Sequence, residues 1–262
     1  FFAVIIACEI GRLVSKKTKV DILVTPVVVL LAGFGASWLL CPLVSYVMYY
    51  LGVFIATATT FQPLLMGVVV SVVVGVILTL PISSAAICAM IFSEAAFGVS
   101  VLNGTSEGFL LAGGACVAGC CAHMVGFAVM SFRENRWGGL VAQGMGTSML
   151  QMPNIVKNPK IWIPPILASA ITGPLATCLF KLEMNGAPVS SGMGTCGLVG
   201  QIGVYSGWVN DVASGAKAAI TGMDWLGLIL ICFVLPAVLA PLINMGCRKL
   251  GWVKDGDMKI NV

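Results

Sequence analysis

The side chains best suited to chemistry in this chain are neutral hydrogen-bonding groups, and they gather in two segments, residues 143–154 and 185–204. Each segment contains the same tetrapeptide, Gly-Met-Gly-Thr, at residues 144–147 and again at residues 192–195. Amide and hydroxyl groups both donate and accept hydrogen bonds, so they match the hydroxyls of a sugar or polyol. The candidate solute contacts are Gln143, Thr147, Gln151 and Asn154 in the first segment, and Asn185, Ser190, Ser191, Thr195 and Gln201 in the second.

An apolar stretch, Ile161–Phe180, separates the two polar segments and is long enough to cross a bilayer, which takes roughly 20 residues. Polar, glycine-broken segments at matching places in a membrane chain indicate a transporter's binding site. Irregular backbone is tolerated at membrane depth only where it lines a cavity. The sequence therefore predicts two re-entrant segments that line a solute site. The alternative is that both are ordinary loops that share four residues by chance.

Three ionisable residues lie inside apolar stretches, where a charge is costly and often functional. Glu9 is one helical turn from Arg12 and can form a local ion pair. Glu94 has no basic neighbour in the sequence and is either a ligand-facing group or a hydrogen-bonded structural carboxylate. His123, the only histidine, either donates to a solute hydroxyl or is packed and hydrogen-bonded within the core. Glu94 and His123 join the candidate solute contacts.

Composition excludes a soluble domain. Only 9% of the 262 residues are charged and 59% are hydrophobic, whereas about a quarter of a soluble domain is charged. Most of the ten cysteines lie in apolar runs and are expected to pack as small apolar residues. Cys116 and Cys120, one turn apart and close to His123, could bind a soft metal, but no second pair supports such a site. We expect no metal, no cofactor, no nucleic-acid partner and no catalytic constellation.

The apolar segments predict an all-helical, polytopic membrane protein that forms a single transmembrane domain over residues 1–262. The first residues are apolar, with neither an initiator Met nor a positive region, so we expect the truncated end of a helix rather than a signal peptide. Small residues at positions 115, 119, 122 and 126 would let helices approach closely. The expected helical segments are Asp21–Leu40, an interfacial or short crossing helix at Pro42–Phe61, Leu64–Leu80, Ala85–Val101, Phe109–Ser131, Ile161–Phe180 and Leu226–Met245.

The distribution of basic residues predicts the orientation. If Leu64–Leu80 and Ala85–Val101 both cross and the polar segments re-enter without crossing, the basic loops share one side of the membrane. Twelve of the 14 Lys and Arg residues then lie on that side and only Lys181 and Lys217 on the other. Because positive residues are retained inside, a cytoplasmic C-terminus is expected. The predicted orientation holds only if Pro42–Phe61 does not change whether the number of membrane crossings is odd or even.

Several segments resemble a known family. The run Ile22–Pro26 that leads to Leu40-Cys41-Pro42 resembles the early membrane segment of the sugar-transporting component IIC of the bacterial phosphotransferase system. The segments Gly146–Pro159 and Ser190–Gly200 are similar to a divergent type-2 EIIC branch that includes perfringolysin regulator-like membrane proteins. The resemblance implies a homodimeric permease of the bacterial plasma membrane that moves a small polar solute by alternating access. It also implies a IIB-type phosphocarrier as partner, so the chain is at most the membrane subunit of a sugar phosphotransferase.

The chain departs from the standard IIC pattern at two places. The standard component has a histidine after the span that matches Leu64–Leu80, where this chain has Pro81-Ile82-Ser83-Ser84. It also has an acidic residue before the proline that matches Pro153, where this chain has Gln151-Met152. Two functions stay open: a permease for a sugar or another small polar solute, and a IIC-like membrane sensor or regulator without phosphorylation-coupled transport.

Overall fold

The computed structural model describes residues 2–15, 21–92 and 105–260. Helices dominate these ranges, and none of the residues in them forms a strand. The predicted all-helical membrane fold is confirmed. The chain divides into two compact units, residues 1–51 and residues 52–262.

The first unit is a helical hairpin. Helix α1 (Phe2–Val14) packs antiparallel to the first part of α2 (Asp21–Phe61), because Gly11 lies against Val29 and Ala7 lies against Gly33. Most of the outward-facing side chains are large and apolar; Trp38, for example, is 78% exposed. Such a surface suits contact with lipid rather than water.

The predicted boundary at Pro42 is wrong. The sequence predicts separate segments before and after Pro42, but α2 is continuous for 41 residues and contains both Pro26 and Pro42. Proline removes one backbone hydrogen bond, but neighbouring groups and local adjustments make it tolerable in membrane helices. A proline alone therefore did not mark a helix end here.

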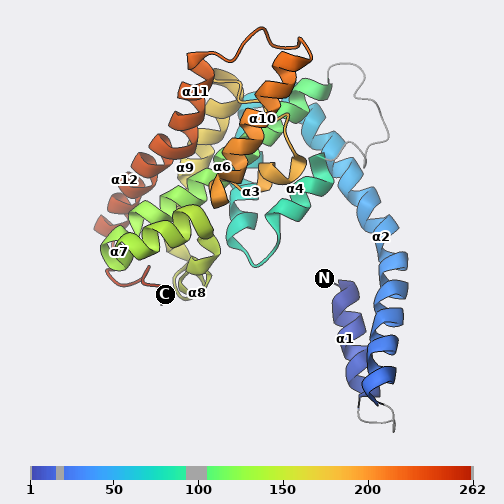
Figure 1. The fold of residues 1–262 in the computed structure, drawn as a ribbon. Helices are drawn as coiled ribbons and strands as arrows, with labels where there is room; N and C mark the ends of the chain where they lie inside the picture. The colour runs from blue at the N-terminus through green and yellow to red at the C-terminus, as the bar shows by residue number, and fades with distance from the viewer. Residues whose placement is uncertain (1, 16–20, 93–104, 261–262) are drawn as a thin grey trace. The chain divides into compact units, whose positions relative to one another are not determined.

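Helices α3 (Pro63–Thr79), α6 (Thr105–Met130) and α9 (Ile163–Pro174) form the centre of the second unit (Figure 1). Helices α3 and α6 run parallel, since Gly119 of α6 lies against Ser71 and His123 lies against Gly75. Helix α9 runs the other way, and Ser71 Oγ donates to Ser169 O at 2.8 Å. A Cβ on Gly119 would collide with the backbone of Ser71, so the predicted close approach of helices along α6 is confirmed.

The last long helix, Gly222–Lys249, runs parallel to α6. It consists of α11 (Gly222–Ile229), a π-helical turn (Leu230–Val234) and α12 (Leu235–Lys249). Ala240 packs with Ala122 and Ala168 in a small buried cluster. The π-helical turn comes just before Pro236, where the missing N–H is accommodated by a wider turn. Another π-helical turn, Leu175–Leu179, directly follows Pro174, the last residue of α9.

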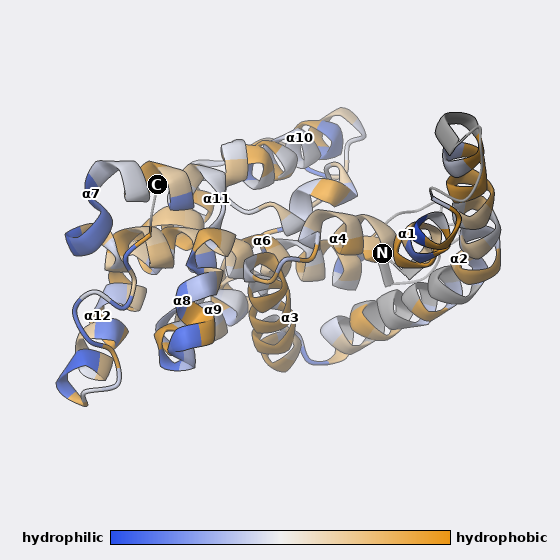
Figure 2. Cartoon of the chain, turned by 90° about the horizontal axis from the view of Figure 1, so that it is seen from below, coloured by the Kyte–Doolittle hydropathy of each residue, from blue (hydrophilic) through white to orange (hydrophobic). Residues whose placement is uncertain are grey.

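These directions place the helix ends of the second unit in two groups. Helices α3 and α6 and the long helix Gly222–Lys249 begin at one end, which we call the Lys181 end. They finish at the other, which we call the basic end, together with α7 (Phe132–Val141) and α8 (Met152–Lys157). Figure 2 shows α3 as strongly hydrophobic, α7 as hydrophilic in its first part, and α8 as a mixture of hydrophilic and hydrophobic residues. The basic end carries Arg133, Arg136, Lys157, Lys160, Arg248, Lys249, Lys254 and Lys259.

Four helical stretches within the described ranges are long and apolar enough to span a membrane. The predicted span Leu64–Leu80 corresponds to α3, which is apolar but shorter. Of the predicted segment Ala85–Val101, the structure describes only the part in α4 (Ser84–Phe92), and Glu94 lies outside the described residues. The four stretches are Val24–Pro42, Glu107–Met130, Pro159–Leu179 and Gly222–Lys249.

Candidate functional site

The two polar segments meet each other. Thr195 Oγ1, in the second Gly-Met-Gly-Thr copy, donates a 2.6 Å hydrogen bond to Gly144 O in the first copy. Thr195 is 1% exposed, and its hydroxyl also lies 3.6 Å from Met124 Sδ of α6. Residues that are 51 positions apart therefore form one junction beside the second half of α6.

The second polar segment follows α6 inward from the Lys181 end. Met184 N donates to Leu110 O at 3.0 Å, near the start of α6. Further along, Cys120 Sγ lies 3.9 Å from Ser191 O. Gly194 has φ +53°, and a Cβ there would press against Cys120 at 2.7 Å. The left-handed conformation and the close approach together explain the glycine at this position.

Helix α10 (Val199–Ala213) returns the chain to the end from which the second segment came. Near its start, Gln201 Nε2 donates to Cys121 Sγ at 3.2 Å. Near its end, Asp211 accepts from Asn185 Nδ2, and Asn185 lies at the beginning of the segment. The second polar segment therefore starts at the Lys181 end, and α10 returns the chain to that end.

The first polar segment approaches α6 from the basic end. It contains a π-helical turn (Ala142–Gly146), a 3-10 turn (Ser148–Gln151) and α8. Gly144 lies near Ala128 of α6, while Ile155 of α8 is buried with Phe127 and Met130. The segment thus reaches the junction with Thr195 and returns to the basic end.

Three predicted solute contacts of the first segment bond to each other. Gln143 Oε1 accepts from Gln151 Nε2 at 2.9 Å, and Gln151 Oε1 accepts from Asn154 Nδ2 at 2.9 Å. Gln143 Nε2 donates to Ser131 Oγ and Gly139 O. Gln151 and Asn154 also donate to the carbonyl oxygens of Met258 and Lys259. Internal partners therefore use every amide N–H of these three side chains.

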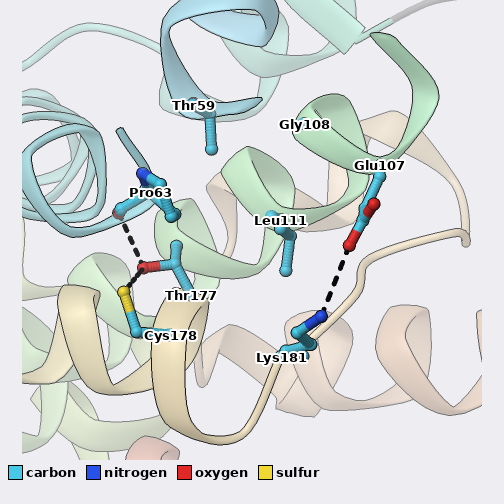
Figure 3. A pocket seen from close by; sticks show the side chains of 8 residues that line it. All are labelled: Thr59, Pro63, Glu107, Gly108, Leu111, Thr177, Cys178 and Lys181. Atoms are coloured by element: carbon cyan, nitrogen blue, oxygen red, sulfur yellow. Dashed lines mark hydrogen bonds and ion pairs between the residues drawn. The ribbon is translucent and has the colours of Figure 1, made fainter. Parts of the chain in front are cut away.

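A pocket of about 240 Å³ lies at the Lys181 end (Figure 3). A loose ion pair, 3.6 Å between Lys181 Nζ and Glu107 Oε1, borders it. Thr177 Oγ1 donates to Pro63 O at 2.8 Å on the facing wall. Of the ten predicted solute contacts that the structure describes, none lines this pocket. Its lining residues are Thr59, Pro63, Glu107, Gly108, Leu111, Thr177, Cys178 and Lys181.

Residues 1–260 match the family model described as Phosphotransferase system, EIIC. The chain belongs to the phosphotransferase system EIIC family. No curated protein and no solved structure matches it. As an EIIC protein it is a membrane permease component of the phosphotransferase system, and the predicted family resemblance is confirmed.

In this EIIC chain His123 is wholly buried, and neither ring nitrogen has a hydrogen-bond partner. Its ring lies against Gly75 of α3 and meets Phe127 edge-on at 6.3 Å. Within the described ranges, two other buried groups near the polar segments share this property, Ser148 Oγ and Gln201 Oε1. Buried polar atoms without partners are rare and call for an explanation. The sequence analysis missed Ser148, although it directly follows Thr147.

The remaining predicted contacts of this EIIC chain have different surroundings. Thr147 Oγ1 caps the following 3-10 turn by accepting from Met149 N at 3.1 Å. Ser190 and Ser191 are buried in the part of the second segment that leads from the Lys181 end to the junction. Asn185, bonded to Asp211 at the Lys181 end, is not brought to the junction. The cysteines considered for metal binding, Cys116 and Cys120, pack with Cys88, Met66 and Val70 in a buried apolar cluster.

Proposed function

We propose that this EIIC chain carries a small polar solute, a sugar or polyol, across the bacterial plasma membrane by alternating access. The observation that carries the proposal is the hydrogen bond between Thr195 and Gly144, which joins two polar segments that approach from opposite ends. If the helical core spans the bilayer, both segments are re-entrant and meet within the membrane. That is the arrangement in which irregular backbone lines a solute path.

The solute would bind at this junction. His123, Ser148 and Gln201 each present a buried polar atom without a protein partner, and Thr195 keeps acceptor capacity on its hydroxyl. A polyol hydroxyl can donate to one such atom and accept from another. Gln143, Gln151 and Asn154 support the junction in this structure, and direct contact with solute would require their internal bonds to break.

Charge supports a cytoplasmic basic end. Eight of the ten Lys and Arg residues between Arg133 and Lys259 lie there, and two, Lys181 and Lys217, lie at the opposite end. By the positive-inside rule the C-terminal part of the chain then faces the cytoplasm. The pocket bordered by Glu107 and Lys181 would open to the outside. A homodimer, as the family resemblance implies, and a IIB-type phosphocarrier at the basic end complete the proposal.

A sensor or regulator is the second candidate. Pro81-Ile82-Ser83-Ser84 follows α3 where the standard component is expected to have a histidine, and Gln151-Met152 precedes Pro153 where that component is expected to have an acidic residue. Gln151 cannot serve as an acid, because an amide has no proton to release near neutral pH. A chain of this kind could bind solute and signal without coupling transport to phosphorylation.

A ligand screen tests the proposed site. Purified protein in detergent is heated with sugars, polyols, sugar phosphates, nucleosides or small acids, each in excess. A ligand at a hundred times its dissociation constant stabilises the folded state by about 2.7 kcal/mol. We expect a sugar or polyol to raise the melting temperature of the wild type. No response to any sugar or polyol by well-folded protein would contradict the proposal.

A further inference from the structure

Residues Gly251–Ile260, which we call the strap, fold back over the basic end after α12. Two of their side chains are anchored in the core: Val253 is 2% exposed and Met258 is fully buried. Both pack with Phe127 and Ile155, which belong to α6 and to the first polar segment. The strap is therefore a packed part of this end of the protein.

Polar side chains of α7 hold the strap at Met258. Glu134 Oε2 accepts from Met258 N at 2.8 Å, and Asn135 Nδ2 donates to Met258 O at 2.8 Å. Asn135 Oδ1 also accepts from Ile260 N at 2.9 Å. A second anchor is Asn158, which donates to Trp252 O and to Asp257 Oδ2. Asn135 and Asn158 thus fasten the strap at two separate places.

Two side-chain hydrogen bonds and one peptide bond lead from the strap to the junction of the polar segments. Met258 O accepts from Gln151 Nε2 at 3.0 Å, and the same nitrogen donates to Gln143 Oε1 at 2.9 Å. Gln143 directly precedes Gly144, whose carbonyl receives the hydrogen bond from Thr195. Because both N–H groups of Gln143 and of Gln151 are used, the two amides have one satisfied orientation.

We propose that the strap is a positioning element for transport: it fixes the first polar segment and so keeps the junction between Gly144 and Thr195 closed. The amides of Gln143 and Gln151 couple the strap to the junction, because Gln151 cannot shift without breaking its bond to Met258 O or to Gln143. Opening of the junction would then require the strap to loosen. Asn135 and Asn158 are positioning residues that act through the strap.

The natural thiol of Cys196, next to Thr195, reports on the junction without any solute. Cys196 is partly buried, and three other cysteines, Cys8, Cys41 and Cys178, are exposed. The test uses the full chain with these three replaced by serine, and measures how fast a small maleimide modifies Cys196. Trypsin cleavage after the exposed Lys254 measures loosening of the strap in parallel.

Asn135→Ala removes two strap hydrogen bonds, and Asn158→Ala removes the second anchor. We expect each to speed cleavage after Lys254 and to raise the rate of Cys196 modification by about fivefold or more, because loss of a single hydrogen bond worth about 1 kcal/mol already gives about fivefold. Asn135→Asp keeps the acceptor for Ile260 N but sets a carboxylate oxygen against Met258 O, so it should raise both rates about as much as Asn135→Ala. Asn210→Ala, at an exposed asparagine of α10, is the matched control and should change neither rate.

The outcomes are decisive for the strap and independent of the transported solute. Faster cleavage with an unchanged Cys196 rate would show a strap that only adds stability, and would overturn the proposal. Unchanged cleavage in both Asn135→Ala and Asn158→Ala would overturn it as well, because the anchors would not hold the strap. An equal increase in Asn210→Ala would also contradict it. None of these results bears on whether the wild type binds a sugar or polyol, which the ligand screen decides.

Discussion

Thr195 Oγ1 lies 2.6 Å from Gly144 O, so the last residue of one Gly-Met-Gly-Thr copy is hydrogen-bonded to the first residue of the other. The bond is buried against Met124 of α6. The two copies of the tetrapeptide, which are visible in the sequence, are therefore in direct contact in the structure. The proposed solute path depends on that contact.

Replacing Thr195 by valine keeps the shape of the side chain but removes the hydroxyl donor. The buried carbonyl of Gly144 then loses this bond, and we expect a loss of about 1–3 kcal/mol in the free energy of unfolding. Thermal melting of the purified protein measures it. Thr195→Ser retains the hydroxyl and should lose less; equal melting temperatures for Thr195→Val and the wild type would show that the bond contributes nothing.

His123→Leu separates a solute-binding role from a structural role. No protein hydrogen bond to either ring nitrogen is present to be lost, and leucine has a similar volume, so stability should change by less than about 1.5 kcal/mol. We expect stabilisation by the sugar or polyol found in the ligand screen to disappear. Normal ligand stabilisation in His123→Leu would exclude the ring as a solute contact.

Gly119→Ala tests the close packing of α3 on α6. A Cβ at this position would collide with the carbonyl of Ser71, and such overpacking costs about 1–3 kcal/mol or more. We expect a lower melting temperature or loss of folded protein. Gly246→Ala is the matched control, because a Cβ at Gly246 of α12 meets nothing within 4 Å; it should be neutral or stabilising. A fully stable Gly119→Ala would contradict the packing.

Glu183 lies beyond the predicted span Ile161–Phe180. Because of this residue, the free energy of unfolding should fall as pH rises. Burial, with the negative charges of Asp211 and Glu107, raises the pKa of Glu183 above its ordinary value. The folded state then holds the proton more tightly than the unfolded state, so this contribution is present at low pH and is lost as pH rises through the folded pKa. Glu183→Gln should melt at a higher temperature than the wild type at neutral pH and show a flatter pH profile. Parallel pH profiles would contradict this assignment.

The sequence predicted the helical core well because composition and glycine spacing report directly on membrane helices. Helices α3 and α6 and the stretch Pro159–Leu179 agree closely with the predicted segments, and the small residues of α6 do lie at helix contacts. The continuous α2 is not predicted by the sequence, because Pro42 indicates a boundary there, whereas in the structure the helix continues through that proline.

The candidate site was harder to predict because spacing along the chain does not show which polar groups satisfy each other. Gln151 was expected to hold solute, and the structure places its amide between Gln143 and Met258 O. The strap contains no motif that marks Met258 as a hydrogen-bond acceptor, since the contact is made by its backbone carbonyl. Solute contact by Gln151 stays a prediction.

Uptake into vesicles tests the central claim most directly. Purified protein is reconstituted into proteoliposomes, and the entry of radiolabelled sugars and polyols is followed in the wild type and in His123→Leu. The account predicts saturable uptake of at least one of them by the wild type and its loss in the variant. Binding of a sugar or polyol without uptake, by well-folded reconstituted protein, would contradict the permease and favour a sensor.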